Sequence, residues 1–90
     1  MPTVQWGLAI GPRAQRFLDK MPPGKLRAQV TKRARNLINN PYPHDKVSIK
    51  GLPKGHETVW RVRQGDYRIL YMVHGTTVLV FDIDDRKDVY

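Results

Sequence analysis

Three arginines in the C-terminal half of the chain are spaced so that they could act together on a phosphate group. Arg61, Arg63 and Arg68 flank the short segment Gly65-Asp66. If that segment is the loop of a two-residue hairpin, Arg63 lies opposite Arg68, and Arg61 emerges on the same face of the sheet. Guanidinium groups bind phosphate through paired, charge-assisted hydrogen bonds. The spacing therefore predicts a small cationic site suited to a phosphate backbone.

The predicted pair of Arg63 and Arg68 has two interpretations. Like charges directly opposite each other destabilise a sheet, and a bound anion would relieve that repulsion. Alternatively, nearby carboxylates neutralise the arginines, and this interpretation stays open for each arginine taken singly. The candidate acids are Asp66, Asp82, Asp84, Asp85 and Asp88.

The same pairing predicts which side chains face inward. Paired residues share a face of the sheet, and successive residues alternate between faces. The face opposite the arginines is then apolar, with Trp60, Val62, Tyr67, Ile69 and Tyr71. A second hairpin around 74–76 places Val78 and Val80 on that apolar face, and Leu79 and Phe81 beside the arginines.

The elements around this hairpin predict an α+β domain. Apolar runs with Gly-containing breaks favour strands at 58–64, 67–73 and 77–83, a short strand within 46–52 and an opening strand at 3–10. Helical spacing of apolar residues predicts a helix from Pro12 to about Met21 and a second one from about Pro23 to Asn40. The apolar stripe of the second helix is expected to be Leu26, Val30, Ala34, Leu37 and Ile38. A tight Pro-Pro-Gly turn makes the two helices an antiparallel hairpin that must cover a sheet.

Composition and charge bound the function further. The 90 residues suit a single domain, 1–90, and the net charge of +8 with a pI near 10.2 favours a polyanionic partner. Most of the excess positive charge lies in residues 12–36, which hold eight basic residues against Asp19 alone. The predicted helices therefore produce most of the long-range positive electrostatic field. A solvated helix face would show the same charges, and that alternative stays open.

Several classes of site and location are not expected. The chain has no cysteine, and its three histidines show no ligand spacing, so we expect neither a metal nor another cofactor. No apolar run approaches the ~20 residues that span a bilayer, and the N-terminus lacks the pattern of a signal peptide. We therefore expect a cytoplasmic protein without membrane contact.

Three strings in the second half resemble a known family. They are KGLP at 50–53, WRVRQGDYRILY at 60–71 and DDRKDVY at 84–90. Together they resemble the RelE/ParE superfamily of bacterial and archaeal toxins, and the resemblance extends over essentially the whole chain. It implies the RelE-like microbial RNase fold, β-α-α-β-β-β(-β), in which a two-helix hairpin packs on one face of a mainly antiparallel sheet.

The resemblance also implies an activity and partners. The protein would be the toxin of a type II toxin–antitoxin system, held inactive by a cognate antitoxin and bound to operator DNA only through that complex. RelE-type members are ribosome-dependent endoribonucleases that cleave mRNA without a metal. In their reaction the ribose 2′-hydroxyl attacks the adjacent phosphate and leaves a cyclic phosphate.

The family motif implies catalytic roles for Arg61, Arg63, Arg68, Arg86 and Tyr90. The first three would stabilise the charge of the phosphorane, Arg86 would support the leaving group, and Tyr90 would act as a base or stacking platform. RelE-type members carry lysines at the places of the first two, and many members carry histidine where Asp85 stands. Arginine is a poor proton acceptor, so the general base stays unassigned.

Contacts to mRNA and ribosomal RNA are expected from a second set of residues. The set comprises basic residues of the second helix and of the following connection, together with one aromatic residue that could pack against a base: Lys25, Lys32, Arg33, Lys50, Lys54 and Phe81. The affinity of such contacts should fall as salt rises.

Two other functions fit the same resemblance. A ParE-type toxin would inhibit DNA gyrase by binding and would need no nuclease site. A degenerate member would act only by binding its antitoxin and regulating its own operon. Fold alone does not separate the three readings, because one fold serves several functions.

Overall fold

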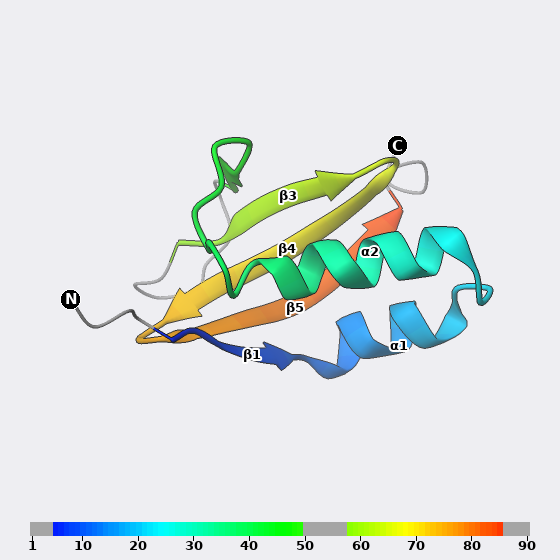
Figure 1. The fold of residues 1–90 in the computed structure, drawn as a ribbon, viewed down its shortest axis with the longest axis horizontal. Helices are drawn as coiled ribbons and strands as arrows, with labels where there is room; N and C mark the ends of the chain where they lie inside the picture. Colours follow the sequence, from blue (N-terminus) through cyan, green and yellow to red (C-terminus); the bar gives the residue numbers. More distant parts are fainter. Residues whose placement is uncertain (1–4, 50–57, 86–90) are drawn as a thin grey trace.

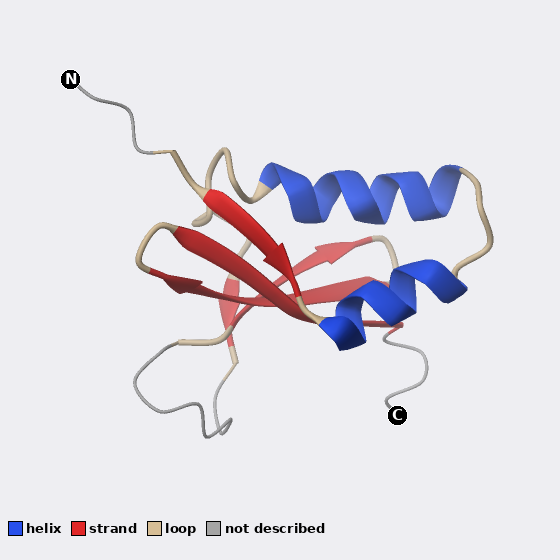
Figure 2. Cartoon of the chain, turned by 90° about the horizontal axis from the view of Figure 1, so that it is seen from below, coloured by secondary structure: helices blue, strands red, loops and turns tan. Residues whose placement is uncertain are grey.

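The computed structural model describes residues 5–49 and 58–85. Within these segments two helices lie on one side of a five-stranded sheet (Figures 1 and 2). In chain order the elements are β1 Gly7–Ile10, α1 Pro12–Lys20, α2 Lys25–Asn36, β2 Val47–Ser48, β3 Trp60–Gln64, β4 Tyr67–His74 and β5 Thr77–Asp85. The predicted α+β class with a helical hairpin on one face is confirmed.

The sheet has the strand order β1-β5-β4-β3-β2. β1 runs parallel to β5, and the other three neighbouring pairs are antiparallel, so the sheet is mainly antiparallel as predicted. The backbone N–H of Gly11 donates to the carbonyl oxygen of Val80 at 2.8 Å, which extends the β1–β5 pairing to the start of α1. Beyond Val80, α1 instead of β1 lies along β5.

Local residue chemistry explains where the helices begin and end. Pro12 occupies the first turn of α1, where its missing N–H costs no hydrogen bond. Gly24 precedes α2 with φ 151°, a backbone conformation that favours glycine, so α2 begins at Lys25 and not at Pro23. After Asn36 the chain leaves the α-helix through shorter turns, such as Leu37 N–H to Ala34 O, and α2 ends before the predicted Asn40.

The β3–β4 hairpin has the predicted register. Arg63 pairs with Arg68 and Gln64 with Tyr67, so Gly65-Asp66 is a two-residue loop. Gly65 adopts φ 62° and no non-glycine residue of the described chain has positive φ, as in a type II′ turn. In the second hairpin His74 pairs with Thr77, which centres the loop on Gly75-Thr76.

A β-bulge interrupts the pairing of β4 with β5. Tyr71 lies opposite Val80 and Leu70 lies opposite Asp82, so Phe81 is an extra residue without a cross-strand partner. Asp82 therefore takes the position opposite Leu70 that an uninterrupted register would give to Phe81. The extra residue also reverses the alternation, so that Ile83 turns into the core opposite Ile69.

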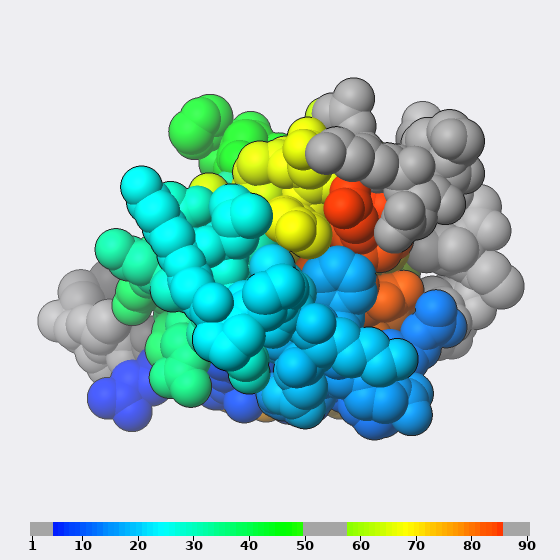
Figure 3. Space-filling view, turned by 90° about the vertical axis from the view of Figure 1, so that its right-hand side faces the viewer, coloured from blue at the N-terminus to red at the C-terminus, as the bar shows by residue number. Residues whose placement is uncertain are grey.

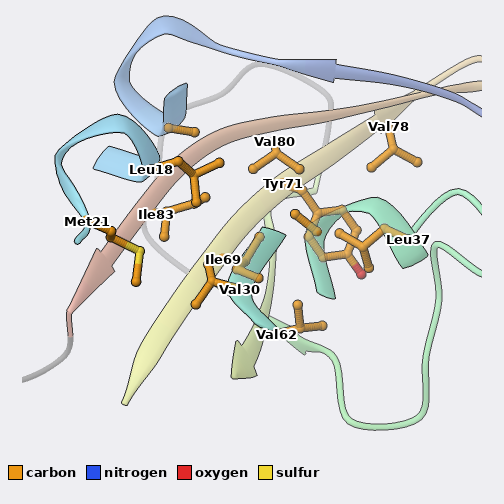
Figure 4. Close-up of a cluster of buried hydrophobic side chains, with 12 residues drawn as sticks. Leu18, Met21, Val30, Leu37, Val62, Ile69, Tyr71, Val78, Val80 and Ile83 are labelled. Carbon is orange, nitrogen blue, oxygen red and sulfur yellow. The ribbon is translucent and has the colours of Figure 1, made fainter. Parts of the chain in front are cut away.

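One apolar core lies between the helices and the sheet (Figure 4). Its members come from both helices, from the residue that directly follows each helix, and from β3, β4 and β5: Ala14, Leu18, Met21, Val30, Ala34, Leu37, Val62, Ile69, Tyr71, Val78, Val80 and Ile83. The predicted inward face of the hairpins is thus confirmed. Leu26 is an exception to the predicted stripe of α2, because its side chain is 60% exposed. It lies in the first turn of α2 beside the tip of the β3–β4 hairpin, where the sheet ends.

The connection between α2 and β2 is fixed to the sheet by polar and aromatic contacts. The buried Tyr71 hydroxyl donates a hydrogen bond of 2.7 Å to the carbonyl oxygen of Pro41. The ring of Tyr42 packs edge-on between Trp6 and Trp60, with centroid distances of 6.3 Å to each. These contacts hold the loop against the start of β3 on the core side of the sheet.

Candidate active site

The structure brings Arg61, Arg63 and Arg68 to the face of the sheet that is turned away from the helices. Val62 and Ile69, their neighbours along β3 and β4, are buried in the core, and alternation directs the arginines to the other side. Arg63 is exposed, whereas Arg61 is half-buried. The clustering predicted from the sequence is present.

Asp84 extends this row of charges to a third strand. Arg63 pairs with Arg68 across β3 and β4, and Arg68 pairs with Asp84 across β4 and β5. The Arg68 guanidinium donates from Nε to Oδ1 of Asp84 at 2.8 Å and from Nη2 to Oδ2 at 3.1 Å. The side chains are 14% and 33% exposed, so the pair is shielded from solvent more than a typical surface ion pair.

This pair decides between the two interpretations of Arg68. An aspartate neutralises it, as the second interpretation held, and the repulsion between Arg63 and Arg68 is relieved from the β5 side. Among residues 5–49 and 58–85, the Arg63 side chain has no hydrogen bond or ion pair. Arg63 is thus the arginine of the row most available to an incoming phosphate.

Asp84 also lines a pocket of about 340 Å³ between α1 and the end of β5. Figure 3 shows α1 lying against β5 on this side of the molecule. The lining combines three cations of α1 with residues of β5: Arg13, Arg16, Phe17, Lys20, Asp82, Ile83 and Asp84. Arg13 reaches Asp82 at 3.6 Å but is 74% exposed, so this contact leaves Arg13 open to solvent. The carboxylate of Asp84 therefore lies at the boundary between the arginine face and a cationic pocket.

The role of Asp84 was not identified from the sequence, where it was only one of several possible neutralising acids. A signal was available in the apolar pattern of β5. Val78 and Val80 alternate in phase, but Ile83 falls out of phase with them. That loss of phase indicates an extra residue in the strand. An extra residue before Asp82 would have placed the side chains of Asp82 and Asp84 on the arginine face.

The residues predicted to bind RNA are distributed differently. Lys25 and Lys32 are exposed on α2, which covers the opposite side of the sheet from the arginines. Arg33 forms an ion pair with Asp45, so it serves to hold the loop after α2. The hydrogen bond from Arg33 lowers the pKa of Asp45 below its usual value. The predicted residues Lys50, Lys54, Arg86 and Tyr90 lie outside the described residues.

No group of three or more histidines, aspartates or glutamates in 5–49 and 58–85 is placed to hold a metal ion. No helix in this part of the chain has the length and apolar character needed to cross a membrane.

Comparisons with known proteins agree on one family. Residues 8–90 match the family model described as the ParE toxin of the type II toxin–antitoxin system parDE. A curated relative from Methanocaldococcus jannaschii, "Putative toxin RelE1", is 30% identical over 89 residues, which cover 97% of each chain.

Two solved structures have a similar fold. One is a chain from the crystal structure of the archaeal RelE–RelB complex of Pyrococcus horikoshii OT3, with a TM-score of 0.74, 21% identity, and coverage of 91% of this chain and 96% of that one. The other is E. coli toxin RelE, a double arginine-to-alanine mutant in the free state, with a TM-score of 0.65 and 19% identity over 94% of this chain and 87% of that one.

Proposed function

The chain belongs to the RelE/ParE superfamily of toxins of type II toxin–antitoxin systems, and from this premise we propose that it is a ribosome-dependent endoribonuclease. Its substrate would be mRNA in the decoding site of the ribosome. The ribose 2′-hydroxyl attacks the adjacent phosphate, the bond to the 5′-oxygen breaks, and the products are a 2′,3′-cyclic phosphate and a 5′-hydroxyl end. No metal takes part in this proposed reaction.

The observation that supports the nuclease reading is the arginine face. In the proposed reaction the phosphorane gains negative charge as it forms, and preorganised cations beside it lower the barrier. Arg61 and Arg63 project from one strand, and Arg68 lies opposite Arg63 on the next. Neighbouring strands are about 4.8 Å apart, so a phosphate held by Arg63 would lie close to the charges of Arg61 and of Arg68, which Asp84 holds in place. Arg86 would support the leaving group, and Tyr90 would complete the site as a stacking platform.

The cationic helices support binding to the ribosome. Lys25 and Lys32 are exposed on the outer side of α2, away from the arginine face. An mRNA strand on one side and ribosomal RNA on the other would fit this separation of charge. Binding to ribosomes should weaken steeply as salt rises, because phosphate contacts release counterions.

The partner that restrains the toxin would be a cognate antitoxin. One structural neighbour is part of a RelE–RelB complex. We propose a corresponding complex for this chain in the cytoplasm, with operator DNA bound only through the antitoxin.

The second candidate is a ParE-type toxin that inhibits DNA gyrase. The match to the ParE family model supports it, and the shared fold does not argue against it. Gyrase inhibition by binding alone would not require three arginines to converge on one face. The third candidate, a degenerate member that only binds antitoxin and regulates its operon, has no specific observation in its favour.

A test with two arms, mRNA cleavage and DNA gyrase inhibition, separates these candidates. Purified protein is added to ribosomes programmed with a defined mRNA, to the same mRNA without ribosomes, and to a DNA gyrase supercoiling reaction. We expect cleavage only with ribosomes, 2′,3′-cyclic phosphate ends, and normal supercoiling. Intact mRNA with inhibited gyrase would establish the ParE-type reading, and no effect in either arm would favour the degenerate one. Arg68→Ala should abolish cleavage, and equal cutting by this variant would contradict the site assignment.

A further inference from the structure

We propose that Asp84 is the general base of the site, the group that removes the proton from the attacking 2′-hydroxyl. This inference rests on the proposed nuclease function and fills the one role that the arginines cannot supply. Arginine remains protonated at any pH at which the protein is folded, so Arg61, Arg63 and Arg68 can stabilise charge but cannot accept a proton. A carboxylate in the same row can accept one.

The position of Asp84 supports the assignment. It lies on the arginine face because the bulge at Phe81 reverses the alternation of β5. Arg68 is its direct cross-strand partner, and Arg63 is the next residue along the same row. A phosphate held by Arg63 would therefore lie within about two strand spacings, or ~10 Å, of the Asp84 backbone, and both side chains extend into that interval.

The bidentate pair with Arg68 fixes the carboxylate without using all of its capacity. Each oxygen of Asp84 accepts one hydrogen bond from Arg68. An ionised carboxylate has about four acceptor sites, so the described residues 5–49 and 58–85 leave two for a substrate hydroxyl. The side chain is 33% exposed, which leaves it accessible from the arginine face and from the pocket between α1 and β5. Arg68 thus acts as a positioning residue for the base.

The charges around Asp84 favour an anionic substrate. Arg68 faces it from β4, Arg13, Arg16 and Lys20 line the same pocket from α1, and Asp82 is the other acid lining it. An RNA strand that enters this region brings its phosphates to cations on both sides of the carboxylate. The cationic surroundings offset the repulsion between Asp84 and the phosphate, which would otherwise keep an anionic base away from its substrate.

The proton and electron balance of the step is simple. The 2′-oxygen forms a bond to phosphorus while its proton moves to Asp84. The bond between phosphorus and the 5′-oxygen breaks, and the departing oxygen takes a proton from water. Asp84 then returns its proton to solvent, so the step needs no further reactant.

The test compares chemistry with binding in two matched variants. Asp84→Asn removes the proton acceptor and keeps the size of the side chain, and Asp19→Asn makes the same change at an exposed aspartate of α1 that does not line the pocket. Single-turnover cleavage is measured on programmed ribosomes at the site that the wild type cuts. Binding is measured with an mRNA that carries a 2′-deoxynucleotide on the 5′ side of that phosphate. Asp84→Glu, which retains the charge that pairs with Arg68, serves as a second variant should the asparagine variant fail to fold.

We expect Asp84→Asn to slow cleavage by roughly 100-fold or more, the range of general-base catalysis, while binding of the deoxy substrate changes less than about threefold. Asp84→Glu should slow cleavage roughly 10- to 100-fold through misplacement of the carboxylate, and Asp19→Asn should cut at the wild-type rate. Wild-type cleavage by Asp84→Asn or Asp84→Glu would overturn the inference. So would a loss of cleavage matched by an equal loss of binding, since Asp84 would then only support the fold. If the wild type itself does not cut, the proposed function fails and this inference fails with it.

Discussion

Replacing Tyr71 by phenylalanine should make the stability of the protein respond differently to alkaline pH. Tyr71 is fully buried, and its hydroxyl donates to the carbonyl oxygen of Pro41 at 2.7 Å. Burial raises the pKa of Tyr71 to about 12 from the usual 10.0. Burial is the largest cause of this rise, nearby Asp45 and Tyr42 act in the same direction, and Arg33 opposes it. The folded protein thus holds this proton more tightly than the unfolded chain does.

The size of the effect follows from this difference in pKa. Since the folded value is the higher one, the contribution of Tyr71 is complete below pH 10 and is lost as the pH rises toward and past 12. A shift of about two units corresponds to about 2.7 kcal/mol in full, of which about 1.4 kcal/mol is lost by pH 11. At pH 7, Tyr71→Phe should cost about 1–3 kcal/mol, because the buried Pro41 carbonyl loses its donor.

The assay is urea unfolding of wild type and Tyr71→Phe at pH 7, 10 and 11. The difference in unfolding free energy between the two proteins should shrink by about 1.4 kcal/mol between pH 7 and pH 11. Other titrating groups are common to both proteins and cancel in that difference. A difference that stays constant over this range would refute the account of Tyr71 as a buried, neutral tether. So would a difference below about 0.5 kcal/mol at pH 7.

Four further substitutions test the packing and the loops. Asp45→Asn should destabilise the protein at pH 7. Because Arg33 lowers the pKa of Asp45 from 3.8, this destabilisation should shrink as the pH falls below 3.8 and through the lowered pKa, and urea unfolding at pH 7 and 2.5 measures the decrease. Leu26 is exposed and Leu37 is buried, so Leu26→Ala should change the free energy of unfolding by less than about 0.5 kcal/mol and Leu37→Ala should lower it by about 2–5 kcal/mol. Urea unfolding measures both, and equal shifts of the midpoint would contradict the burial of Leu37. Gly65→Ala should cost roughly 1–2 kcal/mol through its positive φ, and an unchanged melting temperature would contradict the turn geometry.

Much of the sheet could be predicted because its rules are local. A two-residue loop fixes the pairing on either side of it, and the period of two then assigns every side chain to a face. This reasoning gave the opposition of Arg63 and Arg68 and the inward positions of Val62 and Ile69. The Pro-Pro-Gly turn and the apolar stripes predicted a helical hairpin that covers the sheet, and the family resemblance implied the same arrangement.

The remaining features depend on contacts between distant segments. The bulge at Phe81 lets Ile83 reach the core, and it simultaneously brings Asp84 to Arg68. A strict alternation along β5 does not anticipate that shift. The exposure of Leu26 likewise depends on where the sheet ends beneath α2, and helical spacing alone does not contain that information.

The most direct test of the central claim is single-turnover mRNA cleavage on programmed ribosomes by Arg63→Ala and Arg35→Ala. Both variants lose one exposed positive charge, but Arg63 lies on the arginine face and Arg35 lies on α2. If the arginine face holds the reacting phosphate, Arg63→Ala should slow cleavage roughly 100- to 1000-fold while Arg35→Ala changes it little. Equal rates for the two variants would contradict the account, because Arg63 would then contribute only its share of the net charge.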